Sequence, residues 1–77
     1  MQSTAYFRED VMLKRSYIRV EWVELALSSP AHKEVQAHDG RIRHLVWIED
    51  LQRYLRVVTL EDGVTVHNAF PDRRFKL

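Results

Sequence analysis

The spacing of apolar residues changes at Pro30, and this change constrains the fold more than any other feature of the chain. From Ile18 to Ser28, apolar residues recur with the 3.6-residue period of a helix and leave only a narrow polar face around Glu21 and Glu24. Beyond Pro30 the period becomes two, as in strands. We therefore expect a helix that packs its wide apolar face against a sheet.

The ends of this helix carry separate signals. Ser16 is a suitable N-cap because its hydroxyl can accept a hydrogen bond from the first turn. The run Ser28-Ser29-Pro30 predicts the end, since the residue before a proline is disfavoured in the α region. Upstream, Phe7–Arg15 allows a short additional helix supported by Asp10 and Lys14 at i,i+4.

Four segments after Pro30 alternate as strands do: His32–Ala37, Arg41–Glu49, Tyr54–Leu60 and Val64–Phe70. Short links, two of which contain Gly40 and Gly63, predict tight turns and an antiparallel meander. The predicted fold class is α+β, with one or two N-terminal helices packed on a four-stranded antiparallel sheet. The chain of 77 residues is expected to be a single domain, divided into a frayed start (1–6), a helical part (7–29), a sheet (32–70) and a tail (71–77).

Alternation assigns the strand residues to two faces, one against the helix and one toward water. In the second strand the split is Ile42, Val46 and Ile48 against Arg41, Arg43, Leu45 and Trp47. In the third strand it is Leu55, Val57 and Thr59 against Tyr54, Arg56, Val58 and Leu60. In the fourth strand it is Val64, Val66, Asn68 and Phe70 against Thr65, His67 and Ala69. The face toward water is where a functional site is expected.

Composition narrows the setting of the protein. There are no cysteines, whereas small secreted domains usually carry disulfides, so we expect a reducing compartment such as the bacterial cytoplasm. No signal peptide and no apolar run long enough to cross a membrane is present, so no membrane partner is expected. The net charge is only +1, but most cations lie in the second half of the chain. They form either a phosphate-binding face or solvated strand edges that discourage aggregation.

Several catalytic classes lack support in the sequence. The four histidines are His32, His38, His44 and His67, and none belongs to a metal-binding motif, so no metal or other cofactor is expected. The serines lie at or near the ends of the first long helix, with no nucleophile elbow around them. The only two glycines are turn residues, which leaves no glycine-rich phosphate loop.

The remaining chemistry is that of a metal-independent ribonuclease. Such enzymes move a proton from the 2′-hydroxyl of RNA to the leaving 5′-oxygen while a cation stabilises the charge on the phosphate. His67 is the candidate acid or base, Arg43 and Arg56 are candidates to hold the phosphate, and Tyr54 with Trp47 could stack on unpaired bases. The alternative is that His67 is a hydrogen-bonded structural residue, as a histidine in a strand often is.

The C-terminal run Asn68–Lys76 mixes aromatic residues with Arg73, Arg74 and Lys76. This mixture suits either contact with RNA or docking of a protein partner. The alternative is structural, with Phe70 and Phe75 closing the edge of a small core while the charges stay in water.

The segment Tyr54–Phe75, preceded by Asp39–Arg43 and by a helix that ends at Pro30, resembles the small bacterial family known as domain of unknown function 4258. That family is distantly similar to the RelE-like and BrnT-like toxins of toxin–antitoxin pairs, in which a helix packs on an antiparallel sheet and the activity is RNA cleavage. The resemblance implies site residues at its C-terminal pattern, namely Arg56, His67, Asn68 and Arg73. It also implies a small antitoxin as partner.

One departure bears on activity. Relatives commonly carry a histidine in the N-terminal segment, where this chain has Asp10. If that histidine is catalytic in them, this chain is weak or inactive, or His67 takes over its task.

Two hypotheses of different classes follow. The first is a metal-independent endoribonuclease toxin that acts on RNA or at the ribosome and is covered by an antitoxin. The second is a non-catalytic protein-interaction module. A homodimer is compatible with both.

Overall fold

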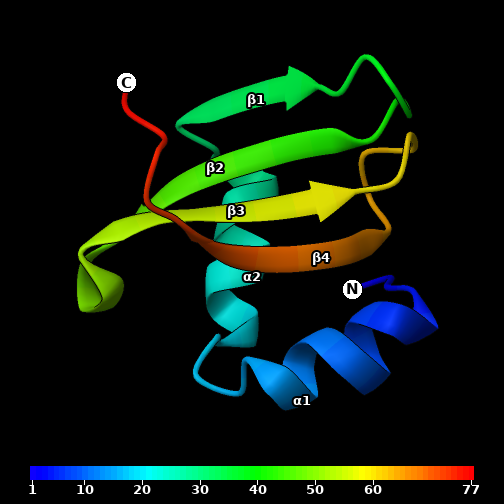
Figure 1. Ribbon diagram of the computed structural model, residues 1–77, viewed down its shortest axis with the longest axis horizontal. Helices are drawn as coiled ribbons and strands as arrows, with labels where there is room; N and C mark the ends of the chain where they lie inside the picture. Colours follow the sequence, from blue (N-terminus) through cyan, green and yellow to red (C-terminus); the bar gives the residue numbers. More distant parts are fainter.

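The computed structural model describes residues 1–77 and consists of helical segments followed by a four-stranded antiparallel sheet. The strands are β1 (His32–Val35), β2 (Ile42–Ile48), β3 (Arg53–Thr59) and β4 (Val66–Asp72). Each strand pairs with the next along the chain, so the sheet order is β1-β2-β3-β4. The predicted α+β class and antiparallel meander are thereby confirmed. Figure 1 shows α2 crossing behind the sheet and the first helical segment lying beside β4.

The first helical segment joins a π-helical stretch, η1 (Phe7–Val11), to α1 (Met12–Lys14), and α2 spans Val20–Ser28. The expected end of α2 is found: the backbone N–H of Ser29 donates to the carbonyl of Leu25 at 2.8 Å, directly before Pro30. None of the helices combines the length and apolar character needed to span a membrane.

The predicted N-cap of α2 is wrong. Ser16 lies in a turn in which the backbone N–H of Ile18 donates to the carbonyl of Arg15 at 3.0 Å. Because this turn uses Ile18, the helix begins later, and Arg19 occupies the cap position without a side-chain hydrogen bond.

The core lies between α2 and the sheet and is closed beside β4 by the first helical segment. Val23 and Ala26 of α2 are fully buried against residues such as Leu55 and Val57 of β3, while Phe7 and Val11 fill the end near β4. The buried face of α2 is narrower than the sequence indicates. Leu25 is 43% exposed and Val20 is 45% exposed, because a single layer of strands covers only one side of the helix.

The start of the chain, expected to be frayed, instead pairs with β4. The backbone N–H of Val66 donates to the carbonyl of Gln2, and the N–H of Thr4 donates to the carbonyl of Val66, both at 2.9 Å. These bonds form a parallel bridge between Ser3 and Val66. They hold the residues around Thr4 next to the start of β4.

A β-bulge interrupts the pairing of β3 with β4. Val58 pairs with Asn68, whereas Thr59 pairs with Val66, so His67 is an extra residue without a partner. Both Val66 and Ala69 are fully buried in the core. The regular alternation predicted for the fourth strand is therefore wrong, because the bulge shifts the pattern by one residue. The grouping of residues by face in the second and third strands agrees with the observed register. Leu45 and Val58, however, which were assigned to the face toward water, are buried.

Candidate functional site

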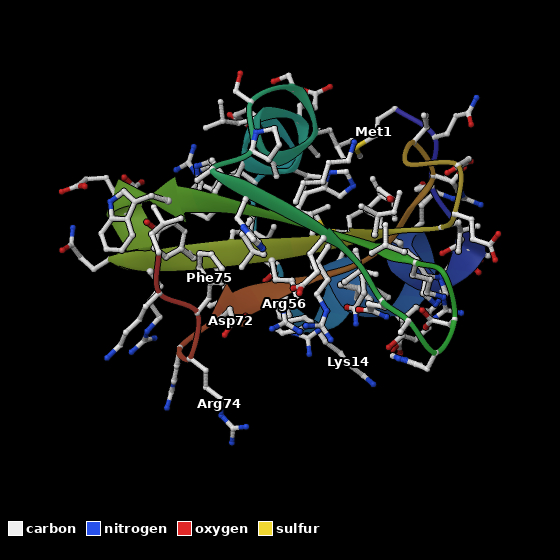
Figure 2. The ribbon with its side chains drawn as sticks, turned by 90° about the horizontal axis from the view of Figure 1, so that it is seen from above. Met1, Lys14, Arg56, Asp72, Arg74 and Phe75 are labelled. Atoms are coloured by element: carbon white, nitrogen blue, oxygen red, sulfur yellow. The ribbon has the colours of Figure 1, made fainter.

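A groove of about 310 Å³ opens on the side of the sheet away from α2. Figure 2 shows Arg56, one of its lining residues, on that side of the sheet. The groove receives side chains from the chain start, the β1–β2 turn, β3 and β4, and most of them are polar: Tyr6, Gln36, His38, Asp39, Arg41, Arg56, His67 and Asn68. We call it the histidine groove.

The β-bulge accounts for the presence of His67 in this groove. Ala69 lies two residues further along β4 and is fully buried on the helix side. With regular alternation His67 would point to that side as well. The extra residue re-aims the imidazole, so it lines the same groove as Arg56 and Asn68.

His67 is held from one side only. Its Nδ1 lies 3.0 Å from the hydroxyl oxygen of Thr4, which also accepts a hydrogen bond from the backbone N–H of Phe7 at 3.2 Å. The ring of Tyr6 lies against the imidazole with 5.0 Å between centroids. No side chain or backbone atom bonds to Nε2. Partial burial, and then the positive charge of Arg41, lower the pKa of His67, so the imidazole is neutral at pH 7.

Arg56 is committed to an ion pair at the edge of the groove. Its Nε and Nη2 both donate to Oδ2 of Asp72, at 2.9 and 2.5 Å, and its guanidinium lies 5.2 Å from the centre of the Phe70 ring. Burial by itself would raise the pKa of Asp72, but hydrogen bonds from Arg74, Arg56 and Phe75 lower it, so the carboxylate is charged. Only Nη1 and one proton of Nη2 remain for another anion.

The opposite wall of the groove comes from the β1–β2 turn. The backbone N–H of Arg41 donates to Oδ1 of Asp39 at 3.0 Å and, more than any other contact, lowers the pKa of that carboxyl. Nε of Arg41 lies 3.7 Å from Asp39, and Nε2 of His38 lies 3.3 Å from it. The groove therefore holds two imidazoles, His38 and His67, together with the guanidinium groups of Arg41 and Arg56.

Asn68 lies beside His67, but its amide oxygen is already used. This oxygen accepts a hydrogen bond from the backbone N–H of Ala69 at 2.9 Å and a longer one from Nη1 of Arg15 at 3.5 Å. The guanidinium of Arg15 also lies 5.8 Å from the centre of the Phe70 ring. Arg15 has no carboxylate partner, so it adds an uncompensated positive charge near this end of the groove.

The other predicted site residues lie outside the groove. Arg43 donates from Nε to Gln36 at 2.9 Å and lies 3.6 Å from the carboxylate of Glu34 in β1. Tyr54 and Arg73 line a separate hollow of about 350 Å³ at the end of the sheet where β3 begins and β4 ends. Arg74 extends into solvent, as Figure 2 shows. Of the predicted set, only Arg56, His67 and Asn68 line the histidine groove.

Eight residues at the groove were not predicted as site residues: Tyr6, Gln36, His38, Asp39, Arg41, Val58 and Phe70, which line it, and Thr4, which contacts His67. Thr4 and Tyr6 could not have been found, because a parallel bridge between the first residues and β4 leaves no pattern in the sequence. His38 and Arg41 flank the turn glycine Gly40, so the expected hairpin was a usable signal for their proximity. Asp10 pairs with Lys14 at 3.2 Å and does not line the groove.

No group of three or more histidine, cysteine, aspartate or glutamate side chains is arranged to hold a metal ion. No family model matches the chain, and no match is found among curated proteins or solved structures.

Proposed function

We propose that the protein is a metal-independent endoribonuclease, the toxin of a toxin–antitoxin pair, and that the histidine groove is its active site. The observation that carries the proposal is the unbonded Nε2 of His67, which lies in a groove shared with Arg41, Arg56 and a second imidazole. A neutral imidazole whose second nitrogen is free is the usual general base at neutral pH. The resemblance of Tyr54–Phe75 to a toxin-like family points to the same chemistry.

The reaction starts with the tautomer of His67 that carries its proton on Nδ1. Thr4 accepts that proton in a hydrogen bond, which leaves the lone pair of Nε2 directed into the groove. Nε2 takes the proton of the 2′-hydroxyl, and the 2′-oxygen attacks the neighbouring phosphorus. The bond from phosphorus to the 5′-oxygen breaks, and His38 in its protonated form, with Nε2 3.3 Å from the carboxylate of Asp39, gives that oxygen a proton and becomes neutral. The products are a 2′,3′-cyclic phosphate and a 5′-hydroxyl end.

The charge that builds up on the phosphate needs a cation in place beforehand. Arg41 is the better candidate, because its nearest carboxylate oxygen is 3.7 Å away, whereas Arg56 donates twice to Asp72. Arg41 thus takes the part that the sequence suggests for Arg43. Arg56 also helps to stabilise the charge on the phosphate, because its Nη1 is free to donate and its positive charge lies at the groove.

The test is cleavage of a fluorescent, unstructured RNA by the purified protein in buffer with EDTA. We expect a product with a 2′,3′-cyclic phosphate, and we expect His67→Ala to slow cleavage by about 100-fold or more. His38→Ala should slow it by a similar factor. Tyr17→Ala is the control, because Tyr17 is 50% exposed and does not line the groove. Intact RNA with the folded wild type, or equal rates for wild type and His67→Ala, would refute the proposal.

Growth of cells that express the protein gives a second test. Wild type should arrest growth, and His67→Ala should not. The rival function, a non-catalytic interaction module, is favoured by one observation: Arg56 is bound to Asp72 and has the contacts of a structural residue. If that rival holds, purified protein leaves RNA intact at every concentration, and Arg56→Ala changes only the affinity for a protein partner.

A further inference from the structure

The hollow at the end of the sheet where β3 begins and β4 ends combines exposed aromatic surface with cations. Trp47 of β2 is 42% exposed, although it is the largest apolar side chain of the sheet. Its Nε1–H donates to a carboxylate oxygen of Glu49 at 2.8 Å, which fixes the orientation of the indole. Tyr54 meets it edge-on with 5.3 Å between ring centres, and Phe75 in turn meets Tyr54 at 5.0 Å.

The same hollow carries Arg53, Arg73 and Lys76, and none of these three cations forms an ion pair. The carboxylate of Asp72 also lines it, but that charge is balanced by Arg56. We call this hollow, defined by Trp47, Arg53, Tyr54, Arg73, Phe75 and Lys76, the aromatic pocket. It has a volume of about 350 Å³ and carries uncompensated positive charge.

The aromatic pocket and the histidine groove are neighbours. Trp47 and Tyr54 pair across the β2–β3 ladder on the face of the sheet opposite the core, the face that also carries Arg56. Arg56 lines the groove, its partner Asp72 lines the pocket, and their ion pair forms the wall between them. An extended ligand on this face would therefore meet both sites.

We propose that the aromatic pocket binds an unpaired nucleobase and the adjoining phosphate of single-stranded RNA. Every base has a π-face that can stack on an exposed, rigid aromatic ring, and unpaired cations beside it suit the backbone. A base inside a duplex has both faces covered by its neighbours, so the pocket selects single strands. The inference rests on the proposed function in that RNA is taken as the ligand, and it defines the substrate class.

A protein partner fits these features less well. The cations could attract an acidic peptide, but acidic side chains would make no use of the exposed face of the indole. An indole fixed in orientation and half open to solvent gives a stacking surface at low entropic cost. We therefore treat an acidic peptide as an alternative outcome of the experiment.

The experiment measures binding of fluorescein-labelled oligouridine by anisotropy, in the His67→Ala background so that the RNA stays intact. Adding Trp47→Ala should raise Kd about tenfold, the usual effect of losing one stacked base. RNA should also quench tryptophan fluorescence, and Trp47→Phe should abolish that quenching, since Trp22 belongs to the helix layer. Tyr17→Ala is the matched control, because Tyr17 is 50% exposed and does not line the pocket.

The outcomes separate this inference from the proposed function. Cleavage by the wild type with an unchanged KM in Trp47→Ala would overturn the inference and leave the nuclease intact. Equal affinity for duplex RNA, or no effect of Trp47→Ala on binding, would also overturn it. Binding of polyglutamate in place of RNA would overturn it in favour of a protein partner. Tight, Trp47-dependent binding of single strands without cleavage in the wild type would support the pocket and reject the nuclease.

Discussion

Two histidines of the sheet have nearly the same immediate contacts and opposite surroundings. Nε2 of His44 lies 3.0 Å from the hydroxyl of Thr59, and Nδ1 of His67 lies 3.0 Å from the hydroxyl of Thr4. Burial lowers the pKa of both, with a smaller effect of Lys33 on His44 and of Arg41 on His67. His44, however, is only 2% exposed on the helix side, and its Nδ1 has no hydrogen-bond partner.

A lowered histidine pKa therefore does not by itself identify a reactive site. Both free nitrogens lack a protein partner, but only the one on His67 faces a groove that a substrate can enter. The free nitrogen of His44 is enclosed in the interior, where an unmet hydrogen bond costs about 1–3 kcal/mol. Access to solvent, rather than titration, separates a structural histidine from a candidate base.

Exchanging each imidazole for a methyl group should have its largest effect on stability at His44. His44→Ala is expected to lower the free energy of unfolding by about 2–4 kcal/mol, because it leaves a cavity between α2 and the sheet. His67→Ala should lower it by less than about 1 kcal/mol, since its ring is partly exposed. Urea denaturation measures both. Equal losses would mean that the two environments differ less than the structure indicates.

Removing the hydroxyl of Thr59 or of Thr4 should have smaller effects, which again differ between the two histidines. Thr59→Val leaves His44 without any hydrogen bond in the interior and should cost about 1–3 kcal/mol of stability. Thr4→Val should cost less stability but should slow RNA cleavage, because the Thr4 hydroxyl holds the imidazole of His67 in its orientation. Parallel denaturation and cleavage assays separate the effects. A Thr4→Val protein with wild-type kcat would show that Thr4 does not position the base.

Asp72→Asn tests whether the wall between the groove and the pocket is structural. The side chain of Asp72 is 5% exposed, and that of Arg56 is 23% exposed, so their ion pair is only partly screened. We expect the variant to lose about 1–2 kcal/mol of stability. If Nε and Nη2 of Arg56, which now donate to Asp72, are then free to bind phosphate, affinity for RNA should rise. A loss of stability without any change in affinity would assign Arg56 a purely structural part.

The sequence predicts the fold well where its pattern is regular. Strict alternation in β2 and β3 assigned Ile48 and Leu55 to the core and Arg56 to the opposite face, as the structure has them. It failed in β4 because Val64–Phe70 alternates without interruption, so nothing in the residue order announces an extra residue at His67. The histidine reached the predicted face through a bulge that the sequence could not reveal.

The composition of the site was harder to predict than its location. Arg43 has the right residue type and the right face, yet Gln36 and Glu34 of the neighbouring β1 region bind its guanidinium. Those contacts depend on the register of β1, which is short and weakly patterned. The positions of Thr4 and Tyr6 depend on pairing between the chain start and Val66, and these two segments are even further apart in the sequence. Long-range pairing, rather than local preference, decides which polar residues share a groove.

The pH dependence of stability gives the finest distinction between the two histidines. Because both pKa values are lowered in the folded protein, the unfolded chain binds more protons once the pH falls below the ordinary histidine value of about 6.5. The stability that each neutral imidazole confers is thus complete above that value and is lost as the pH falls toward the folded pKa. Each group contributes at most about 1.4 kcal/mol per pH unit. His44→Gln should reduce the loss of stability at low pH more than His67→Gln does, because His44 is enclosed and His67 can take a proton from the groove. Urea denaturation at pH 5 and at neutral pH measures the slopes, and a flatter profile for His67→Gln would reverse the assignment of the two environments.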